Sequence, residues 1–125
     1  MTEPTNLNLT IKFNDSELDD DERTLQARKL LKQMKSMDEV ESASQLLDTN
    51  PPAGNKSVGG FLVGMLTAEI SAENAKGVFR FLSDRLSGKT IEMEVEANGK
   101  KLKLKASSRA ELLTAIEAAQ QFVAS

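Results

Sequence analysis

The dipeptide Asn98-Gly99 limits the possible folds of this chain more than any other part of the sequence. It separates two alternating segments, residues 90–97 and 100–106, and Asn-Gly is the strongest short signal for a type I′ hairpin turn. A two-residue turn fixes the pairing of the strands. The predicted pairs are Ala97 with Lys100, Glu96 with Lys101, Val95 with Leu102, Glu94 with Lys103, Met93 with Leu104 and Glu92 with Lys105. One face is then apolar, the other sets three glutamates against three lysines, and a slip in register would bury charge.

The first half of the chain predicts a strand, a helix and a second strand. Residues 7–13 alternate between apolar and polar side chains, which is typical of a half-buried strand. An acidic run over 15–22 precedes a helix that we expect to end near Met37, with basic residues in its later turns, as the helix dipole favours. Residues 40–47 alternate weakly, and we interpret them as a short strand.

The second half predicts a long helical segment and a C-terminal helix. Residues 61–86 carry apolar side chains at helical spacing, and Ser71 is a candidate N-cap at which this helix breaks or kinks. Ser108 followed by Glu111 predicts a capping box that opens the last helix. The expected fold is α+β, in the order β-α-β-α-β-β-α, with a small mixed sheet and the helices packed mainly on one face. We expect one domain over residues 1–125, with residues 1–5 disordered.

Composition argues against several classes of function. The chain of 125 residues contains no Cys, His, Tyr or Trp, so the commonest general base, the thiolate nucleophile and the usual zinc ligands are missing. We therefore expect no enzyme, no catalytic residue, no metal site and no cofactor. A net charge of −3 argues against a dedicated nucleic-acid binder. No signal peptide and no membrane span are expected, which predicts a soluble cytoplasmic protein.

The loop over residues 51–60 is rich in proline and glycine and runs into an apolar segment. The run Gly54-Asn55-Lys56-Ser57 is similar to a phosphate-binding loop, but both required glycines are replaced, by Asn50 and Asn55. Nucleotide hydrolysis is therefore not expected. A weak anion site, made by Lys56 with the N–H groups of Gly59 and Gly60, stays open. The favoured interpretation is a tight connector.

Two other segments have a structural and a functional interpretation. Acidic residues at alternate positions from Asp15 to Asp21 are spaced as in a calcium loop, but Asp20 stands where such a loop needs glycine. A solvated helix start is the better interpretation. Residues 61–66 are more apolar on all sides than an exposed helix should be, so they are either buried or meet a partner. Internal packing is favoured there over self-association.

Several short motifs between residues 40 and 124 resemble one known family. They are the turn Pro52-Ala53-Gly54-Asn55-Lys56, the Gly-rich apolar segment 58–66, the segment Phe79-Arg80-Phe81-Leu82-Ser83-Asp84-Arg85 and the hairpin around Asn98-Gly99-Lys100-Lys101. Together they resemble the effector-associated constant components of bacterial NTP-dependent conflict systems. The chain departs from that pattern in having Phe81-Leu82 where a Trp-Leu pair is frequent, and we expect it to stand alone, without a fused effector domain.

The resemblance implies a non-enzymatic adaptor that couples to variable effector proteins of a bacterial conflict (defence) system. Protein partners and a homo-oligomer are then expected, without nucleic acid. The alternative is a small-molecule or anion-binding domain that uses the Gly/Lys loop 54–60. The candidate binding residues are Pro52, Gly54, Lys56, Gly59, Gly60, Phe61 and Gly64.

Overall fold

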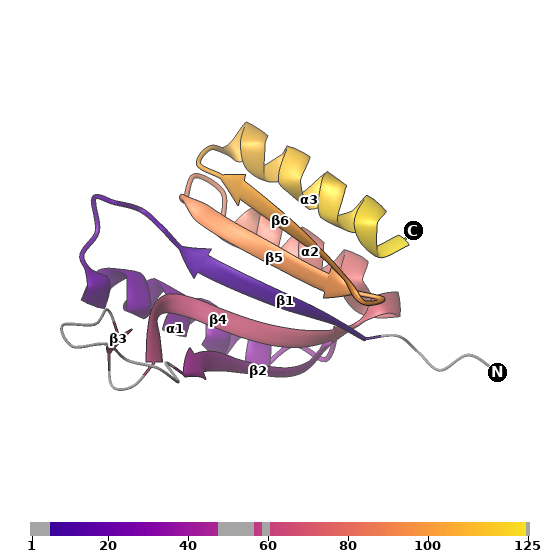
Figure 1. The fold of residues 1–125 in the computed structure, drawn as a ribbon, viewed down its shortest axis with the longest axis horizontal. Helices are drawn as coiled ribbons and strands as arrows, with labels where there is room; N and C mark the ends of the chain where they lie inside the picture. The colour runs from indigo at the N-terminus through magenta and orange to yellow at the C-terminus, as the bar shows by residue number, and fades with distance from the viewer. Residues whose placement is uncertain (1–5, 48–56, 59–60, 125) are drawn as a thin grey trace.

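The computed structural model describes residues 6–47, 57–58 and 61–124 of the protein. Figure 1 shows a sheet seen from one face, with α1 and α2 behind it and α3 beside its last strand. The elements are β1 (Asn6–Phe13), α1 (Asp20–Lys35), β2 (Val40–Leu47), β3 (Ser57–Val58), β4 (Phe61–Ser71), the short 3₁₀ turn η1 (Ala72–Asn74), α2 (Ala75–Arg85), β5 (Ile91–Ala97), β6 (Lys100–Ala106) and α3 (Arg109–Ala124).

In the described part of the chain, the strands form one sheet in the order β2-β4-β1-β5-β6, and β3 pairs with the start of β4. Every described pairing is antiparallel. The strands β1, β2, β4 and β5 with α1 and α2 form the ferredoxin-like arrangement of two interleaved βαβ units. The strand β6 and the helix α3 extend that arrangement at one side, so β6 is an edge strand.

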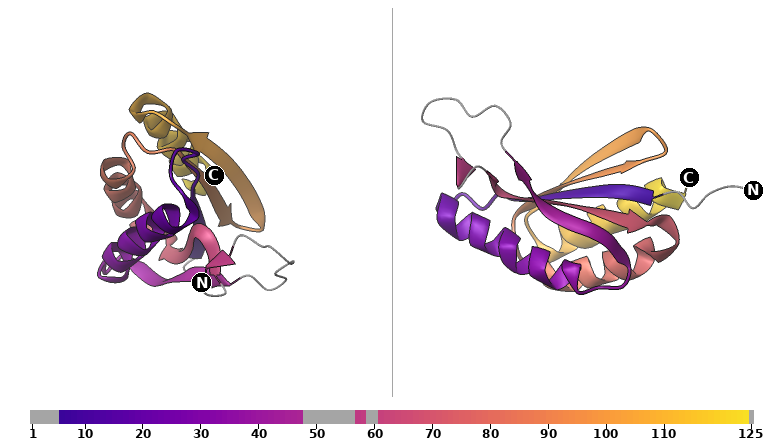
Figure 2. Two further views of the ribbon diagram at one scale, coloured as in Figure 1. Left: turned by 90° about the vertical axis from the view of Figure 1, so that its left-hand side faces the viewer. Right: turned by 90° about the horizontal axis from the view of Figure 1, so that it is seen from below.

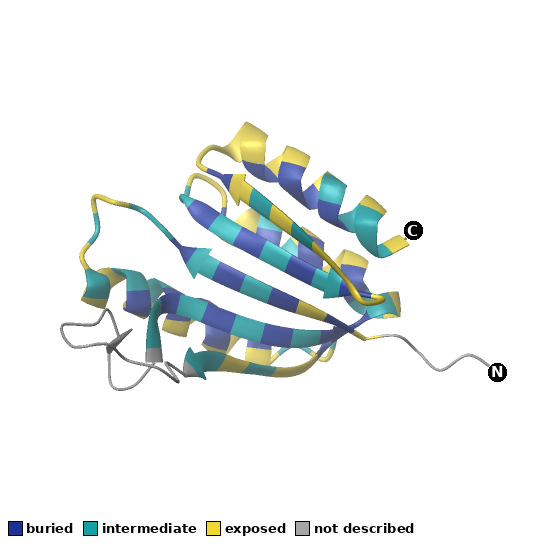
Figure 3. Ribbon diagram, viewed as in Figure 1, coloured by how far each residue is buried: buried dark blue, intermediate teal, exposed yellow. Residues whose placement is uncertain are grey.

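The core lies on one face of the sheet, between the strands and the helices. Buried and partly exposed residues alternate along β1, β4 and β5, as Figure 3 shows. The buried side chains of these strands form one cluster with those of α1, α2 and α3. Figure 2 shows the helices gathered on one side of the curved sheet, which confirms that they pack on one face.

The predicted hairpin is confirmed in detail. The strands β5 and β6 pair in the predicted register, from Ala97 opposite Lys100 to Glu92 opposite Lys105. Asn98 and Gly99 have φ angles of 56° and 76°, and a type I′ turn needs positive φ at both central residues. The predicted strand over 7–13, the helix after the acidic run and the strand over 40–47 are also confirmed.

The predicted helix over residues 61–86 is wrong in its first part. Residues 61–71 form β4, which lies between β1 and β2 near the middle of the sheet, and only Ala75–Arg85 is α-helical. Leu66, Ala68 and Ile70 face the core and are buried, so the apolar character of this segment reflects burial within the sheet. Ser71 ends the strand and precedes η1, near the predicted break.

Two statements about the sheet are corrected as a consequence. The element order is β-α-β-β-β-α-β-β-α, because β4 replaces the first part of the predicted helix and β3 lies within the predicted loop over residues 51–60. The described sheet is antiparallel and not mixed, because neighbouring strands run in opposite directions at every described pairing. The α+β class stands. The expectation for residues 1–5 lies outside the described residues.

The starts of α1 and α3 are stabilised by side chains that bind free backbone N–H groups. Asp19 and Glu22 form a reciprocal capping box at α1, with distances of 2.8 and 3.0 Å between backbone nitrogen and carboxylate oxygen. At α3, the Glu111 N–H donates to Ser108 Oγ at 3.1 Å, as predicted. The Glu111 carboxylate accepts from the N–H and the hydroxyl of Ser107 instead of from the N–H of Ser108. That part of the predicted capping box is wrong.

Candidate functional site

The face of the sheet opposite the helices is a polar surface that several described strands share. We call it the open face and define it by the outward-pointing residues of β1, β4, β5 and β6. They are Asn8, Thr10, Lys12, Met65, Thr67, Glu69, Glu92, Glu94, Glu96, Lys101, Lys103 and Lys105. None of these residues is buried. We treat this polar face, with its regularly placed charges, as a candidate contact surface.

The charges of the open face form stripes along the strands. The lysines of β6 make a positive stripe at the edge of the sheet, and the glutamates of β5 make a negative stripe beside it. Four glutamates and four lysines on this face balance in number. Stripes of opposite charge orient a partner protein that carries the complementary pattern. Because the positive and negative charges are equal in number, the surface does not attract charged molecules in general.

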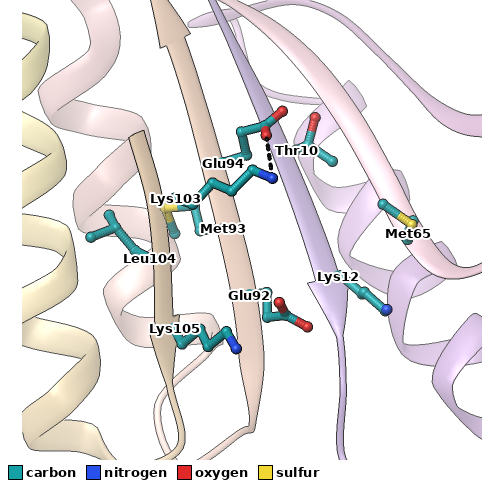
Figure 4. A pocket seen from close by; sticks show the side chains of 9 residues that line it. All are labelled: Thr10, Lys12, Met65, Glu92, Met93, Glu94, Lys103, Leu104 and Lys105. Atoms are coloured by element: carbon teal, nitrogen blue, oxygen red, sulfur yellow. Dashed lines mark ion pairs between the residues drawn. The ribbon is translucent and has the colours of Figure 1, made fainter. Parts of the chain in front are cut away.

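One of the three Glu–Lys pairs of the hairpin closes into an ion pair in the described structure. Lys103 Nζ lies 3.8 Å from Glu94 Oε1, and the two side chains point toward each other in Figure 4. The Lys103 side chain is 81% exposed, so this pair contributes a few tenths of a kcal/mol at most. The lysines are therefore weakly held and are free to bind a partner's carboxylates.

A groove of about 390 Å³ lies over β1 and the hairpin on the open face. Charged side chains of β1, β5 and β6 share it with Thr10 and Met65, as Figure 4 shows, whereas the side chains of Met93 and Leu104 lie on the other face of the hairpin. The lining residues are Thr10, Lys12, Met65, Glu92, Met93, Glu94, Lys103, Leu104 and Lys105. A mostly polar lining of this kind is compatible with a non-obligate protein contact.

Neutral polar residues occupy the centre of the open face. Thr10 lies opposite both Thr67 of β4 and Glu94 of β5, and Thr10 Oγ1 is 3.5 Å from Thr67 Oγ1. Asn6 donates to the Glu69 carboxylate at 2.6 Å near the start of β1. The hydroxyl contact is long and therefore weak, so both threonines retain hydrogen-bonding capacity for a partner.

Most of the binding residues predicted from the sequence fall outside the described residues. These are Pro52, Gly54, Lys56, Gly59 and Gly60, and their predicted role stays a prediction. Phe61 is the first residue of β4. Gly64 is described, and it lies in the same strand on the buried side. The structure thus brings Phe61 and Gly64 into β4, next to the end of β3.

Gly64 occupies a site where only glycine fits. Its φ is +64°, and a Cβ there would lie 3.0 Å from the Phe13 carbonyl oxygen and 3.1 Å from Arg23 Cβ. The β2–β4 pairing is irregular around Gly64, between the partners of Gln45 and Leu47. Its N–H donates to Thr24 Oγ1 at 3.2 Å. Close packing of β4 against α1 explains this glycine.

A second hollow, of about 260 Å³, lies where β4 begins. Lys12, Asp20, Arg23, Leu62 and Val63 are among the residues that line it. Arg23 Nη2 is held by Asp20 at 2.7 Å, whereas Arg23 Nε is buried and has no hydrogen-bond partner among the described residues. Asp20 offsets the charge of Arg23, so Lys12 and the unpaired Arg23 Nε are the groups that favour an anion there.

Metal binding by side chains of the described residues would depend mainly on Asp and Glu, since the chain contains no Cys or His. No group of three or more Asp or Glu side chains in this part of the chain is placed to hold a metal ion. Among the described residues, Glu111 has a lowered pKa, because the Ser107 hydroxyl and N–H donate hydrogen bonds to its carboxylate. That carboxylate caps a helix, and its shift has a structural cause.

Sequence reasoning identified the hairpin half of the open face and missed the rest. Thr10 and Lys12 are the polar members of the alternating segment 7–13, so that alternation was the available signal for them. Met65 carried no such signal, because it belongs to the segment predicted as a helix. The pairing of β1 with both β4 and β5 joins all three residues in one surface.

Comparisons with family models, with curated proteins and with solved structures gave no match for this chain. No helix within the described residues is both long and apolar enough to cross a membrane. The function is therefore inferred from the residues of the chain and their arrangement.

Proposed function

We propose that the protein is a non-enzymatic interaction module that couples to a variable effector protein of a bacterial conflict system, and that the open face is its contact surface. The observation that carries this proposal is that the described helices leave the open face uncovered, with striped charges and a groove. The resemblance of residues 40–124 to the constant components supports the same role.

The open face suits a reversible contact better than a permanent one. Its residues are polar, its charges balance, and Met65 supplies limited apolar area within the groove. Permanent interfaces are more apolar, whereas non-obligate ones are about as polar as the rest of a protein surface. An adaptor that exchanges effectors needs a contact of this second kind.

The proposal is tested with the effector proteins that are encoded beside this gene in its native host. Each is titrated against the purified protein by calorimetry. Thr10→Arg places a long charged side chain in the middle of the open face, where it points to solvent and leaves the core intact. We expect this variant to weaken binding at least about tenfold.

Gln33→Arg is the matched control, because it adds the same side chain to an exposed position of α1. It should bind as the unchanged protein does. If no neighbouring effector binds, or if Thr10→Arg and Gln33→Arg bind alike, the proposed contact surface is wrong. Light scattering in the same buffer reports whether the protein self-associates, as the resemblance implies.

The alternative function, binding of an anion or small molecule at loop 54–60, is favoured by one observation. The hollow beside Lys12 and Arg23 lies at the start of β4, a few residues after that loop in the sequence. Titration with phosphate and with nucleotides by calorimetry tests it. Binding that is unchanged in Lys56→Ala and in Arg23→Gln would rule out an anion site at this place.

A further inference from the structure

The outer edge of β6 carries a row of backbone groups that no described strand pairs. Among the described strands, β6 ends the sheet and has β5 as its one partner. In a two-residue hairpin, the pair that flanks the turn, here Ala97 and Lys100, exchanges hydrogen bonds, and every second pair after it does the same. The N–H and C=O groups of Lys101, Lys103 and Lys105 therefore point away from β5.

The same three residues place their side chains on the open face. All three are exposed, and they stand at alternate positions, so their ammonium groups form one row along the edge. A strand added outside β6 would set its own residues opposite these lysines on the same face. Carboxylates at alternate positions of the added strand would then meet the ammonium groups.

The other side of such a strand would lie over a second groove. This groove has a volume of about 500 Å³ and runs between β6 and α3. Small or apolar residues make up most of its lining, which consists of Leu104, Lys105, Ala110, Glu111, Thr114, Ala115 and Ala118. Small or apolar side chains of an added strand would fit here.

We propose that the outer edge of β6 binds an extended segment of a partner protein, with acidic residues at alternate positions and small or apolar residues between them. The segment would add a strand to the sheet through hydrogen bonds with Lys101, Lys103 and Lys105. This inference rests on the proposed function in that the occupant belongs to a protein partner. The inference goes beyond that function because it names the chemistry of the bound segment and the edge of the sheet that the segment occupies.

The chain itself contains a strand with the required chemistry. Residues 91–97 read Ile-Glu-Met-Glu-Val-Glu-Ala, and as β5 they set their glutamates opposite the same lysines from the inner side. A second copy of this chain is disfavoured as the occupant, because β6 against β6 would place lysine opposite lysine. Charge complementarity therefore selects an acidic partner.

The test uses a peptide that contains the sequence of residues 91–97 and a control peptide with its three glutamates replaced by lysine. Binding of each to the full chain is measured by fluorescence anisotropy. The acidic peptide should bind, and its affinity should fall as salt is added. The lysine peptide should bind more than about tenfold more weakly. Equal binding of the two peptides, or no binding of either, would overturn the inference.

Two variants of β6 locate the binding. Lys103→Pro removes an N–H that points outward and leaves the bonds to β5 in place, so it should weaken the acidic peptide about tenfold. Lys103→Gln keeps the N–H and removes the charge, which should reduce the salt dependence in a folded protein. Lys32→Gln on α1 is the control for the loss of one charge. Unchanged binding in both Lys103 variants would show that the peptide binds elsewhere and would contradict the inference.

The outcomes separate this inference from the proposed function. If an effector protein binds and the acidic peptide does not, the edge of β6 is the wrong site while the proposed function stands. If the peptide binds as described and no effector does, the edge is correct and the proposed function fails. Light scattering without the peptide gives one further outcome. If the protein forms a dimer that Lys103→Pro abolishes, a second copy of the chain is the occupant, and the proposal of an acidic partner is overturned.

Discussion

The N–H of Gly64 donates to Oγ1 of Thr24 at 3.2 Å, and this hydrogen bond joins the irregular part of β4 to α1. Both residues are buried, and Thr24 is one of two buried polar side chains in the described residues. The bond satisfies a backbone group where the β2–β4 ladder is interrupted. It therefore fixes the position of α1 on the sheet, and with it the packing behind the open face.

Replacing Thr24 with valine should lower the free energy of unfolding by about 1–3 kcal/mol. The side chain keeps its shape, but the Gly64 N–H is left buried without an acceptor. Urea unfolding followed by circular dichroism measures the change. Thr114→Val is the control, because Thr114 is exposed on α3. A loss in Thr24→Val no larger than in this control would show that the bond contributes nothing.

Gly64→Ala should destabilise the protein by more than about 2 kcal/mol. A positive φ alone costs an alanine about 1–2 kcal/mol, and here the added Cβ also meets the backbone of Phe13 at 3.0 Å. Gly88→Ala separates the two effects, because Gly88 has a φ of +80° and no atom within 4 Å of an added Cβ. Equal losses of unfolding free energy in the two variants would contradict the close contact of β4 with β1 and α1.

Gly99→Val should lower the melting temperature by several degrees. Gly99 has a φ of 76°, and a β-branched side chain disfavours that conformation strongly. A loss of about 1 kcal/mol corresponds to roughly 4 °C for a domain of this size. Thermal unfolding is compared with that of Ser87→Val, at an exposed position outside the helices and strands. An unchanged melting temperature in Gly99→Val would rule out the type I′ turn.

Glu111 should contribute stability that depends on pH. Its folded pKa is lowered because the Ser107 hydroxyl and N–H donate to the carboxylate. A lowered folded pKa means that the contribution is present above the ordinary pKa of glutamate and is lost as the pH falls through the lowered value. Glu111→Gln should therefore be less stable than the unchanged protein at neutral pH, and the difference should shrink in acid.

Thermal unfolding at pH about 7 and at pH about 3 measures this difference. Glu117→Gln on the same helix is the control, since Glu117 is exposed and caps nothing. If the difference in stability between Glu111→Gln and the unchanged protein is the same at both pH values, the cap does not require the charged form of the carboxylate.

The hairpin was predictable because independent local signals agree on it. Asn98-Gly99 specifies the turn, and the alternation on both sides specifies which face is buried. The register then follows without any tertiary information. The helix α1 was predictable for a similar reason, since its acidic start and basic end agree with its apolar stripe.

The strand β4 was not predictable in the same way, because its sequence fits both periods. Phe61 and Met65 stand four residues apart, as do Leu66 and Ile70, which fits a helix, while Leu66, Ala68 and Ile70 alternate as in a strand. A strand between two others is selected by its neighbours, here β1 and β2, and that selection is a tertiary effect. The extent of the open face could not be predicted from the sequence either, because it depends on the order of the strands in the sheet.

Amide hydrogen exchange along β6, with and without the peptide of residues 91–97, tests most directly whether the sheet binds a partner at this edge. In the free protein, the amides of Leu102 and Leu104 should exchange slowly, because they donate to β5, and those of Lys101, Lys103 and Lys105 should exchange fast. With the peptide bound, the three lysine amides should become protected. Two results would contradict an open β6 edge that binds an acidic strand. In one, the lysine amides already exchange slowly in the free protein; in the other, they still exchange fast at saturating peptide.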